Sequence, residues 1–281
     1  MKNWIANGAI LTFLLAANFA YADEWSGADY AKNSLVQQTH GEQLLSRIPF
    51  TGNEAILDVG CGDGRVTATI AVRVPEGFVI GIDPSDSMLD KAQSMLDAHA
   101  NLTFAKGAAE SFSLDQRFDH AFSFYAMHWV VEQERALQNI YSHLKPNGQL
   151  HVIFAPSKEG LPFDAALQKT LLSWKEEFAD FVNPLQVFDT ETYRKMLVGA
   201  GFHVQSIQYV YYVHTHENKE KLKSWVKQWL PQGKHLSPSD QDLFMDELFD
   251  NYFMEVGLPS DTQGPVTWGE YKIIAEAIRA E

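Results

Sequence analysis

Short apolar runs alternate with helical patterns over the stretch from residue 55 to residue 154, and this alternation constrains the fold more than any other feature. Five runs are typical of strands: residues 55–59, 78–82, 102–105, 120–124 and 150–154. Helical patterns at 65–74, 85–99 and 132–144 lie between them, and the last repeats apolar residues at i, i+3, i+4 and i+7. Such an order predicts a parallel sheet covered by helices on both faces and joined by right-handed crossovers.

A glycine-rich loop, Gly60-Cys61-Gly62-Asp63-Gly64, follows the first predicted strand directly and opens a helix. Glycines at this point permit a tight turn and let a ligand approach the backbone closely. The start of the helix also presents N–H groups that have no partner within the helix. Because the first strand–helix turn of an open α/β sheet is where cofactors bind, this loop is the predicted cofactor site.

The spacing of the loop and the acids around it indicate which nucleotide it binds. Dinucleotide enzymes favour G-x-G-x-x-G, whereas this loop is one residue shorter and no P-loop Lys-Ser/Thr pair follows it. Asp58 and Asp63 would repel a pyrophosphate but suit a ligand that carries an ammonium and a sulfonium. Asp83 ends the second strand, where an acid accepts hydrogen bonds from ribose hydroxyls. The alternative is that all three are ordinary turn or capping acids.

The segments 56–64 and 81–83 resemble motifs I and II of class I S-adenosylmethionine-dependent methyltransferases. The resemblance implies a doubly wound, Rossmann-like sheet of seven strands, the last antiparallel, and S-adenosylmethionine as cofactor with S-adenosylhomocysteine as product. Ala108 stands where many relatives have an aspartate near the adenine amino group, and an alanine side chain cannot accept that hydrogen bond. The predicted cofactor-binding residues are Asp58, Gly60, Cys61, Gly62, Asp63, Gly64, Asp83, Pro84, Ala108, Ala109, Ser123 and Phe124.

A finer resemblance concerns the methyl acceptor. Residues 118–129, 132–136 and 139–141, with 30–34 and Gln37, are similar to juvenile hormone acid methyltransferases and more distantly to trans-aconitate methyltransferases. The resemblance implies that Gln37 and Trp129 hold the carboxylate of a small acid, and the many aromatic residues after 156 permit an apolar one. An ionised carboxylate is already a nucleophile, so positioning and desolvation matter more than a base. An amide and an indole N–H are neutral donors that orient such an anion.

Other interpretations of these residues stay open. Gln37 and its neighbour Gln38 can be exposed helix residues, and Trp129 can belong to the core. His128 can act as a general base if the acceptor is a phenol or an amine. His214 and His216 alternate on one predicted strand but lack a third ligand, so we expect no metal site.

The region 156–281 continues the sheet and adds helices. Helical patterns at 164–181 and 190–201 precede a strand at 204–213, and two more helices follow around Trp225 and Leu248. Residues 271–277 fit a strand or a helix equally well. We therefore expect one methyltransferase domain over 23–281, with the cofactor-binding core at 40–155 and a helical substrate cap within 156–281. The formal net charge of −14, from 36 acids and 22 bases, argues against nucleic acid as a partner.

Residues 1–22 read as a secretory signal peptide. Lys2 precedes an apolar run, and Ala20-Tyr21-Ala22 supplies the small residues of a cleavage site. We expect export by cleavage after Ala22, with no stable membrane span afterwards; an uncleaved anchor or a cytoplasmic chain is the alternative. Export separates the chain from a cytoplasmic cofactor, so a non-catalytic binding protein on the same scaffold is a second hypothesis. A nucleotide-dependent oxidoreductase is a third, which the short loop disfavours.

Overall fold

The computed structural model describes residues 35–281, so the predicted signal peptide and the segment 30–34 lie outside the described residues. Within 35–281 no helix is both long enough and apolar enough to cross a membrane. The chain forms two compact units. Of the described residues, the first unit contains those up to Pro156 with Gln186–Tyr209 and Ile273–Glu281, and the second contains Ser157–Leu185 and Val210–Lys272.

One seven-stranded sheet has the order β3-β2-β1-β4-β5-β7-β6, which confirms the predicted strand number. The strands are β1 (Ala55–Val59), β2 (Phe78–Asp83), β3 (Leu102–Lys106), β4 (Phe118–Phe124), β5 (Leu144–Phe154), β6 (Phe202–His216) and β7 (Val266–Arg279). The first five pair in parallel, and β7 runs antiparallel to β5, with Phe154 opposite Ile273. The doubly wound α/β fold and its antiparallel last strand are confirmed.

The strand order reverses at β1, since β2 lies on one side of it and β4 on the other. Chain connections leave this point in opposite directions and open a crevice beyond the carboxyl ends of β1 and β4. Ligands of open α/β sheets bind in that crevice, so the fold alone places a site next to the glycine-rich loop.

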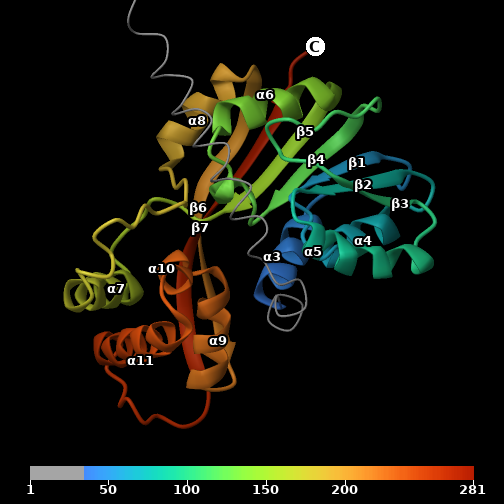
Figure 1. Cartoon of the computed structure of the whole chain (residues 1–281). Helices are drawn as coiled ribbons and strands as arrows, with labels where there is room; N and C mark the ends of the chain where they lie inside the picture. Colours follow the sequence, from blue (N-terminus) through green and yellow to red (C-terminus); the bar gives the residue numbers. More distant parts are fainter. Residues whose placement is uncertain (1–34) are drawn as a thin grey trace, which may run out of the picture. The chain divides into compact units, whose positions relative to one another are not determined.

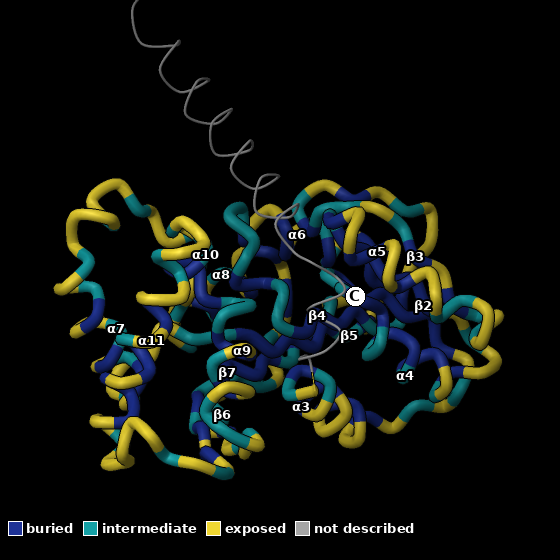
Figure 2. The backbone as a smooth tube through the Cα atoms, turned by 60° about the horizontal axis from the view of Figure 1, so that its bottom comes forward, coloured by how far each residue is buried: buried dark blue, intermediate teal, exposed yellow. Residues whose placement is uncertain are grey.

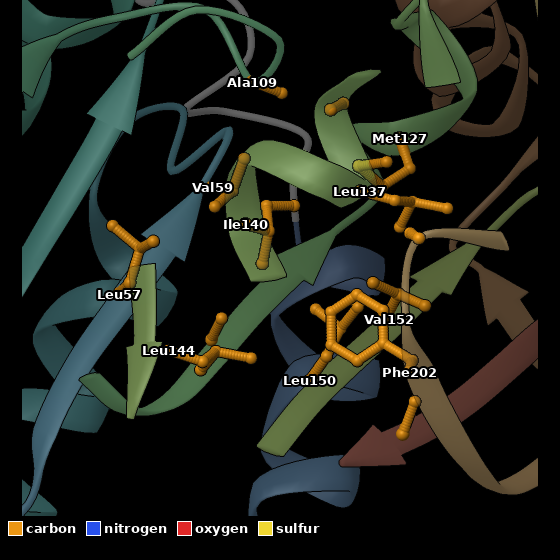
Figure 3. Close-up of a cluster of buried hydrophobic side chains, with 14 of the residues drawn as sticks. Leu57, Val59, Ala109, Met127, Leu137, Ile140, Leu144, Leu150, Val152 and Phe202 are labelled. Carbon is orange, nitrogen blue, oxygen red and sulfur yellow. The ribbon is translucent and has the colours of Figure 1, made fainter. Parts of the chain in front are cut away.

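Helices cover both faces of the sheet in the first unit (Figure 1). On one face lie α3 (Leu35–Leu45), α4 (Arg65–Arg73) and α5 (Asp86–Ala92), and on the other α6 (Gln133–His143) and α8 (Thr190–Gly199). The main apolar core lies under α6, where Ile140 belongs to one buried cluster with Leu57 of β1 and Val152 of β5 (Figure 3). The tube in Figure 2 is dark blue along the central strands, which are buried, whereas most residues of the edge strand β6 are half-buried or exposed.

Several predicted elements differ from the observed ones; the strand expected at 150–154, for example, is β5, which already begins at Leu144. The helix expected at 85–99 ends as an α-helix at Ala92 and continues as a 3-10 helix, Gln93–Ala98, that buries no residue. The helix expected at 164–181 is α7 (Pro162–Ser173), because most of the residues after Ser173 are exposed and offer no apolar face. The ambiguous segment 271–277 is part of strand β7, whose residues Ile273 and Ile274 are buried against β5.

The second unit contains four helices: α7, α9 (Lys219–Trp229), α10 (Pro231–His235) and α11 (Pro238–Glu255). Helices α7 and α11 pack together, and the buried Asn251 amide donates to the Thr170 hydroxyl at 2.9 Å. Phe163, Tyr252 and Trp268 form its aromatic core, with the rings of Phe163 and Trp268 4.8 Å apart. Its role as a substrate cap stays a prediction.

Candidate active site

The three glycines of the loop all adopt positive φ angles, of 76°, 55° and 80° for Gly60, Gly62 and Gly64. Side chains are also excluded sterically: a Cβ on Gly60 would lie 2.2 Å from the Cβ of Ala126, and one on Gly64 would lie 2.6 Å from the Phe104 ring. The loop therefore needs glycine for its backbone conformation and for close packing.

The backbone of β2 and the Asp83 carboxylate fix this loop. The N–H groups of Gly60 and Cys61 donate to the Ile82 carbonyl at 2.8 and 2.9 Å. One Asp83 oxygen accepts from the Gly62 N–H at 2.9 Å, and the other accepts from the Ser85 N–H at 2.9 Å. Asp83 thus shapes the loop, which is the role that the alternative of a turn or capping acid predicts.

Asp58 points from β1 toward α4 and is 1% exposed. The Thr67 hydroxyl donates to its Oδ2 at 2.7 Å, while Oδ1 has no hydrogen-bond partner among residues 35–281. Burial raises the pKa of Asp58 to about 7, and the negative charge of Asp83 adds to the rise. An unpaired buried carboxylate oxygen is costly, so this geometry favours a ligand with a cationic donor.

The other acid of the loop, Asp63, has a partner in the protein. Arg65 Nε lies 3.0 Å from its Oδ2, which makes an ion pair at the first turn of α4. Burial raises the pKa of Asp63, and Arg65 opposes that rise. Burial and the neighbouring carboxylates raise the pKa of the Cys61 thiol, which therefore stays protonated at neutral pH. Of the loop's acids, Asp58 rather than Asp63 is available to a cation.

A cleft opens beside the loop, with about 400 Å³ of space when the solvent at its mouth is included. Its walls come from α3, β1, the loop, the start of α4 and the end of β4: Gln37, Gln38, Asp58, Gly60, Cys61, Gly62, Asp63, Arg65, Val66 and Phe124. Gln37 is 9% exposed, and its Oε1 has no partner in the described part of the chain. The structure therefore brings the predicted acceptor residue Gln37 into one cleft with the predicted cofactor loop.

Several predicted site residues lie outside that cleft wall. The Ser123 hydroxyl donates to the Val59 carbonyl at 2.8 Å and so joins β4 to β1. Ala109 is buried in the apolar core, and its carbonyl accepts from the Asn139 amide of α6 at 3.0 Å. Pro84 and Ala108 are half-buried beside the ends of β2 and β3.

His128 and Trp129 belong to a short 3-10 helix, Met127–Trp129, just beyond β4. The His128 ring is buried, and its Nδ1 accepts a long hydrogen bond of 3.4 Å from the Ala155 N–H. Trp129 is half-buried, with its ring 5.6 Å from that of His128. Both residues lie at the carboxyl end of β4, near the switch point but not among the residues that line the cleft.

Comparison with known proteins agrees with this geometry. Residues 56–148 match a family model described as a methyltransferase domain. A trans-aconitate 2-methyltransferase from Shigella flexneri is 25% identical over 264 residues, which cover 92% of this chain and 99% of that protein. A juvenile hormone acid O-methyltransferase from Bombyx mori is 28% identical over 191 residues, 62% of this chain and 65% of that protein.

Residues 56–148 carry a methyltransferase domain, and the sheet has the fold of class I S-adenosylmethionine-dependent methyltransferases. Solved structures of low identity share its fold. The YcgJ protein from Bacillus subtilis superposes with a TM-score of 0.60 at 19% identity, over 86% of this methyltransferase and 99% of that chain. A phosphoethanolamine N-methyltransferase from Haemonchus contortus, in complex with S-adenosyl-L-methionine, gives a TM-score of 0.55 at 17% identity, over 86% of this methyltransferase and 53% of that chain.

The residues of the methyltransferase fit the cofactor. The unpaired Oδ1 of Asp58 suits an ammonium group, the three glycines leave the loop without obstructing side chains, and Asp83 stands where a ribose is expected. Val66 and Thr67, on the first turn of α4, also serve the site, one as cleft wall and one as the hydrogen-bond donor to Asp58. Their position just after the loop was the only signal in the sequence for them.

Proposed function

We propose that this methyltransferase transfers the methyl group of S-adenosylmethionine to the carboxylate of a small organic acid, giving a methyl ester and S-adenosylhomocysteine. The observation that carries the proposal is the burial of Gln37 in the cleft formed by the glycine-rich loop. Its amide offers two N–H donors to a carboxylate, and their direction is set by rotation of the amide. The relatives named for trans-aconitate and juvenile hormone acid support an acid as acceptor.

The acids around the loop give binding an order. Without a cation in the cleft, Asp58, Asp63 and Asp83 repel the carboxylate of an acid substrate, because charges in a partly dry site interact strongly. When bound, S-adenosylmethionine supplies an activated methyl group on a sulfonium. A ligand ammonium at Asp58 neutralises part of the acidic field, so the acid substrate binds best to the cofactor-loaded protein. Gln37 then holds the carboxylate by neutral donors.

No base is needed, because the acceptor is ionised before it binds. The hydrogen bond that His128 Nδ1 accepts from Ala155 places the proton of the neutral ring on Nε2, which makes Nε2 a donor. This arrangement speaks against the alternative in which His128 deprotonates a phenol or an amine. It leaves His128 a role in supporting the segment after β4, since its carbonyl also accepts from the Gln186 N–H at 2.8 Å.

The test is methyl transfer from labelled S-adenosylmethionine to trans-aconitate and to juvenile hormone acid, with Gln37→Ala and Gln38→Ala compared with the wild-type protein. Gln38 lines the same cleft but is only half-buried, which makes it the matched control. We expect base-labile product from the wild type and a KM for the acid about tenfold higher in Gln37→Ala than in Gln38→Ala. Base-stable product alone contradicts the carboxylate assignment, and equal effects of the two variants contradict the role of Gln37.

A further inference from the structure

Tyr125, the residue after β4, has a left-handed backbone with a φ of 58°. Non-glycine residues in this region are uncommon and are held by their surroundings, often at functional sites. The Tyr125 N–H donates to the Ile153 carbonyl at 2.8 Å, and its hydroxyl shares a hydrogen bond with His40 Nδ1. The two rings also stack, with centroids 6.0 Å apart.

Both neighbours of Tyr125 in the chain belong to the wall of the active site. Phe124 lines the cleft. Ala126 stands against Gly60 so closely that a Cβ on Gly60 would lie 2.2 Å from the Ala126 Cβ. The left-handed turn at Tyr125 therefore occurs between two residues that contact the cofactor cleft and its loop. It lies at the switch point where the carboxyl ends of β1 and β4 diverge.

The partner of Tyr125 lies on the cleft face of α3. Gln37, His40 and Gly41 are spaced i, i+3 and i+4, so they share one face of the helix, and all three are buried. Gln37 lines the cleft, and Gly41 brings the backbone of α3 so near α4 that a Cβ would lie 3.1 Å from Val66 Cγ1. His40, 3% exposed, lies one turn from Gln37.

Among residues 35–41 of helix α3, no apolar side chain is buried. Its buried apolar side chains, Leu44 and Leu45, lie two turns further on, at the other end of the helix. Besides the packing of Gly41 on Val66 and Phe124, the hydrogen bond between His40 and Tyr125 ties this turn to the end of β4. Because a displacement of about 1 Å can cost on the order of a hundredfold in rate, the position of this helical turn matters to any ligand that Gln37 holds.

We propose that His40 and Tyr125 form a positioning pair that fixes the Gln37 turn of α3 against the cleft and so sets the affinity for the acid acceptor. The proposal rests on the proposed function, which makes Gln37 the carboxylate-binding residue. Tyr125 acts through His40 and α3, not by touching the acceptor. The cofactor loop is held separately by Ile82 and Asp83, so its ligand affinity does not depend on the pair.

A double-mutant cycle tests the coupling. Tyr125→Phe removes the hydroxyl and keeps the ring, and it is combined with Gln37→Ala. The control Tyr209→Phe removes another hydroxyl of the first unit, one that accepts from the Thr190 N–H at 3.3 Å. We expect Tyr125→Phe to raise the KM for trans-aconitate or juvenile hormone acid roughly tenfold in the wild-type background. In the Gln37→Ala background the rise should be less than about twofold, because the Gln37 amide that the pair positions is already absent.

Two further readouts separate positioning from a general loss of structure. S-adenosylhomocysteine affinity, measured by calorimetry, stays within about twofold of wild type in Tyr125→Phe. Amide hydrogen exchange at residues 35–40 becomes faster in Tyr125→Phe and not in Tyr209→Phe. Equal effects in both backgrounds, a parallel loss of S-adenosylhomocysteine affinity, or unchanged exchange in α3 would each overturn the proposal.

The failure of the proposed function would look different. In that case the wild-type protein makes no base-labile ester from either acid, and the cycle is read from hydrogen exchange alone. Faster exchange at residues 35–40 then still supports the pair as the tie that holds α3, and unchanged exchange overturns it.

Discussion

The affinity for the cofactor product should depend on pH through Asp58, and Thr67→Val should move that dependence. Asp58 is 1% exposed and burial raises its pKa to about 7, although the Thr67 hydroxyl, 2.7 Å from Oδ2, opposes the rise. A ligand ammonium binds the ionised carboxylate. The dissociation constant of S-adenosylhomocysteine should therefore rise about tenfold between pH 8 and pH 6 and about a hundredfold by pH 5. Asp83, whose pKa burial raises to about 6, steepens the loss below pH 6.

The size of the change in the Asp58 pKa that Thr67→Val should cause follows from the strength of the hydrogen bond between Thr67 and Asp58. A hydrogen bond to a charged group contributes about 1.5–3 kcal/mol, and about 1.4 kcal/mol corresponds to one pKa unit. Thr67→Val keeps the shape and removes the donor, so the midpoint of the titration should rise by at least about one unit. Calorimetric titration from pH 5 to pH 9 then shows roughly fivefold weaker binding than wild type at pH 7, with the two proteins converging at pH 9.

The stability of the ligand-free protein provides the control for that titration. The pKa of Asp58 in the folded state lies above its ordinary value of 3.8, so this group binds a proton more readily in the folded protein between pH 4 and pH 7. Its contribution to the free energy of unfolding therefore decreases as the pH rises through that window, in the opposite direction to ligand affinity. An affinity that is flat from pH 8 to pH 6 in the wild type, or an unchanged midpoint in Thr67→Val, would refute the reasoning about Asp58.

Three further predictions concern separate parts of the chain. Gly60→Ala should abolish measurable S-adenosylhomocysteine binding, because its Cβ would lie 2.2 Å from the Ala126 Cβ. The control Gly257→Ala, with a φ of 71° and nothing within 4 Å of the new Cβ, should lose only about 1 kcal/mol of stability in a thermal melt and bind normally. Equal behaviour of the two variants contradicts the packing argument. Ser123→Ala removes the donor to Val59 and should cost about 1 kcal/mol in the free energy of unfolding at unchanged S-adenosylhomocysteine affinity; a fall in affinity would restore the predicted cofactor role of Ser123. Amino-terminal sequencing of the protein expressed with its own leader should begin at Asp23, and a chain that begins at Met1 contradicts the signal peptide.

The sequence predicted the first five strands and the cofactor loop because both follow from local rules. Buried parallel strands are short apolar runs, and a glycine-rich turn between a strand and a helix adopts a characteristic backbone conformation. Thus the strand Ala55–Val59 and the positive φ angles of the loop glycines agree with the expectation. The direction of β7 depends instead on its neighbour: Ile273 and Ile274 are apolar in a helix or a strand, and pairing with β5 makes the choice.

The site was less predictable where it depends on contacts between distant segments. Gln37 joins the cleft because α3 packs on the start of α4, which its own segment does not encode. The bond between His40 and Tyr125 spans 85 residues and depends on a backbone turn that no propensity predicts for tyrosine. Asp83 was expected to face a ribose, and its bonds to the Gly62 and Ser85 N–H groups became visible only in the folded loop.

The position of the transferred methyl group tests the central claim most directly. The wild-type protein is incubated with S-adenosylmethionine labelled in its methyl carbon and with trans-aconitate or juvenile hormone acid, and the product is analysed by NMR. A methyl carbon bonded to a carboxyl oxygen is the predicted result, with Asp58→Asn and Gln37→Ala both reducing its formation. A label found on nitrogen, on carbon or on a phenol oxygen, or no transfer to either acid, would contradict a methyltransferase that acts on carboxylates.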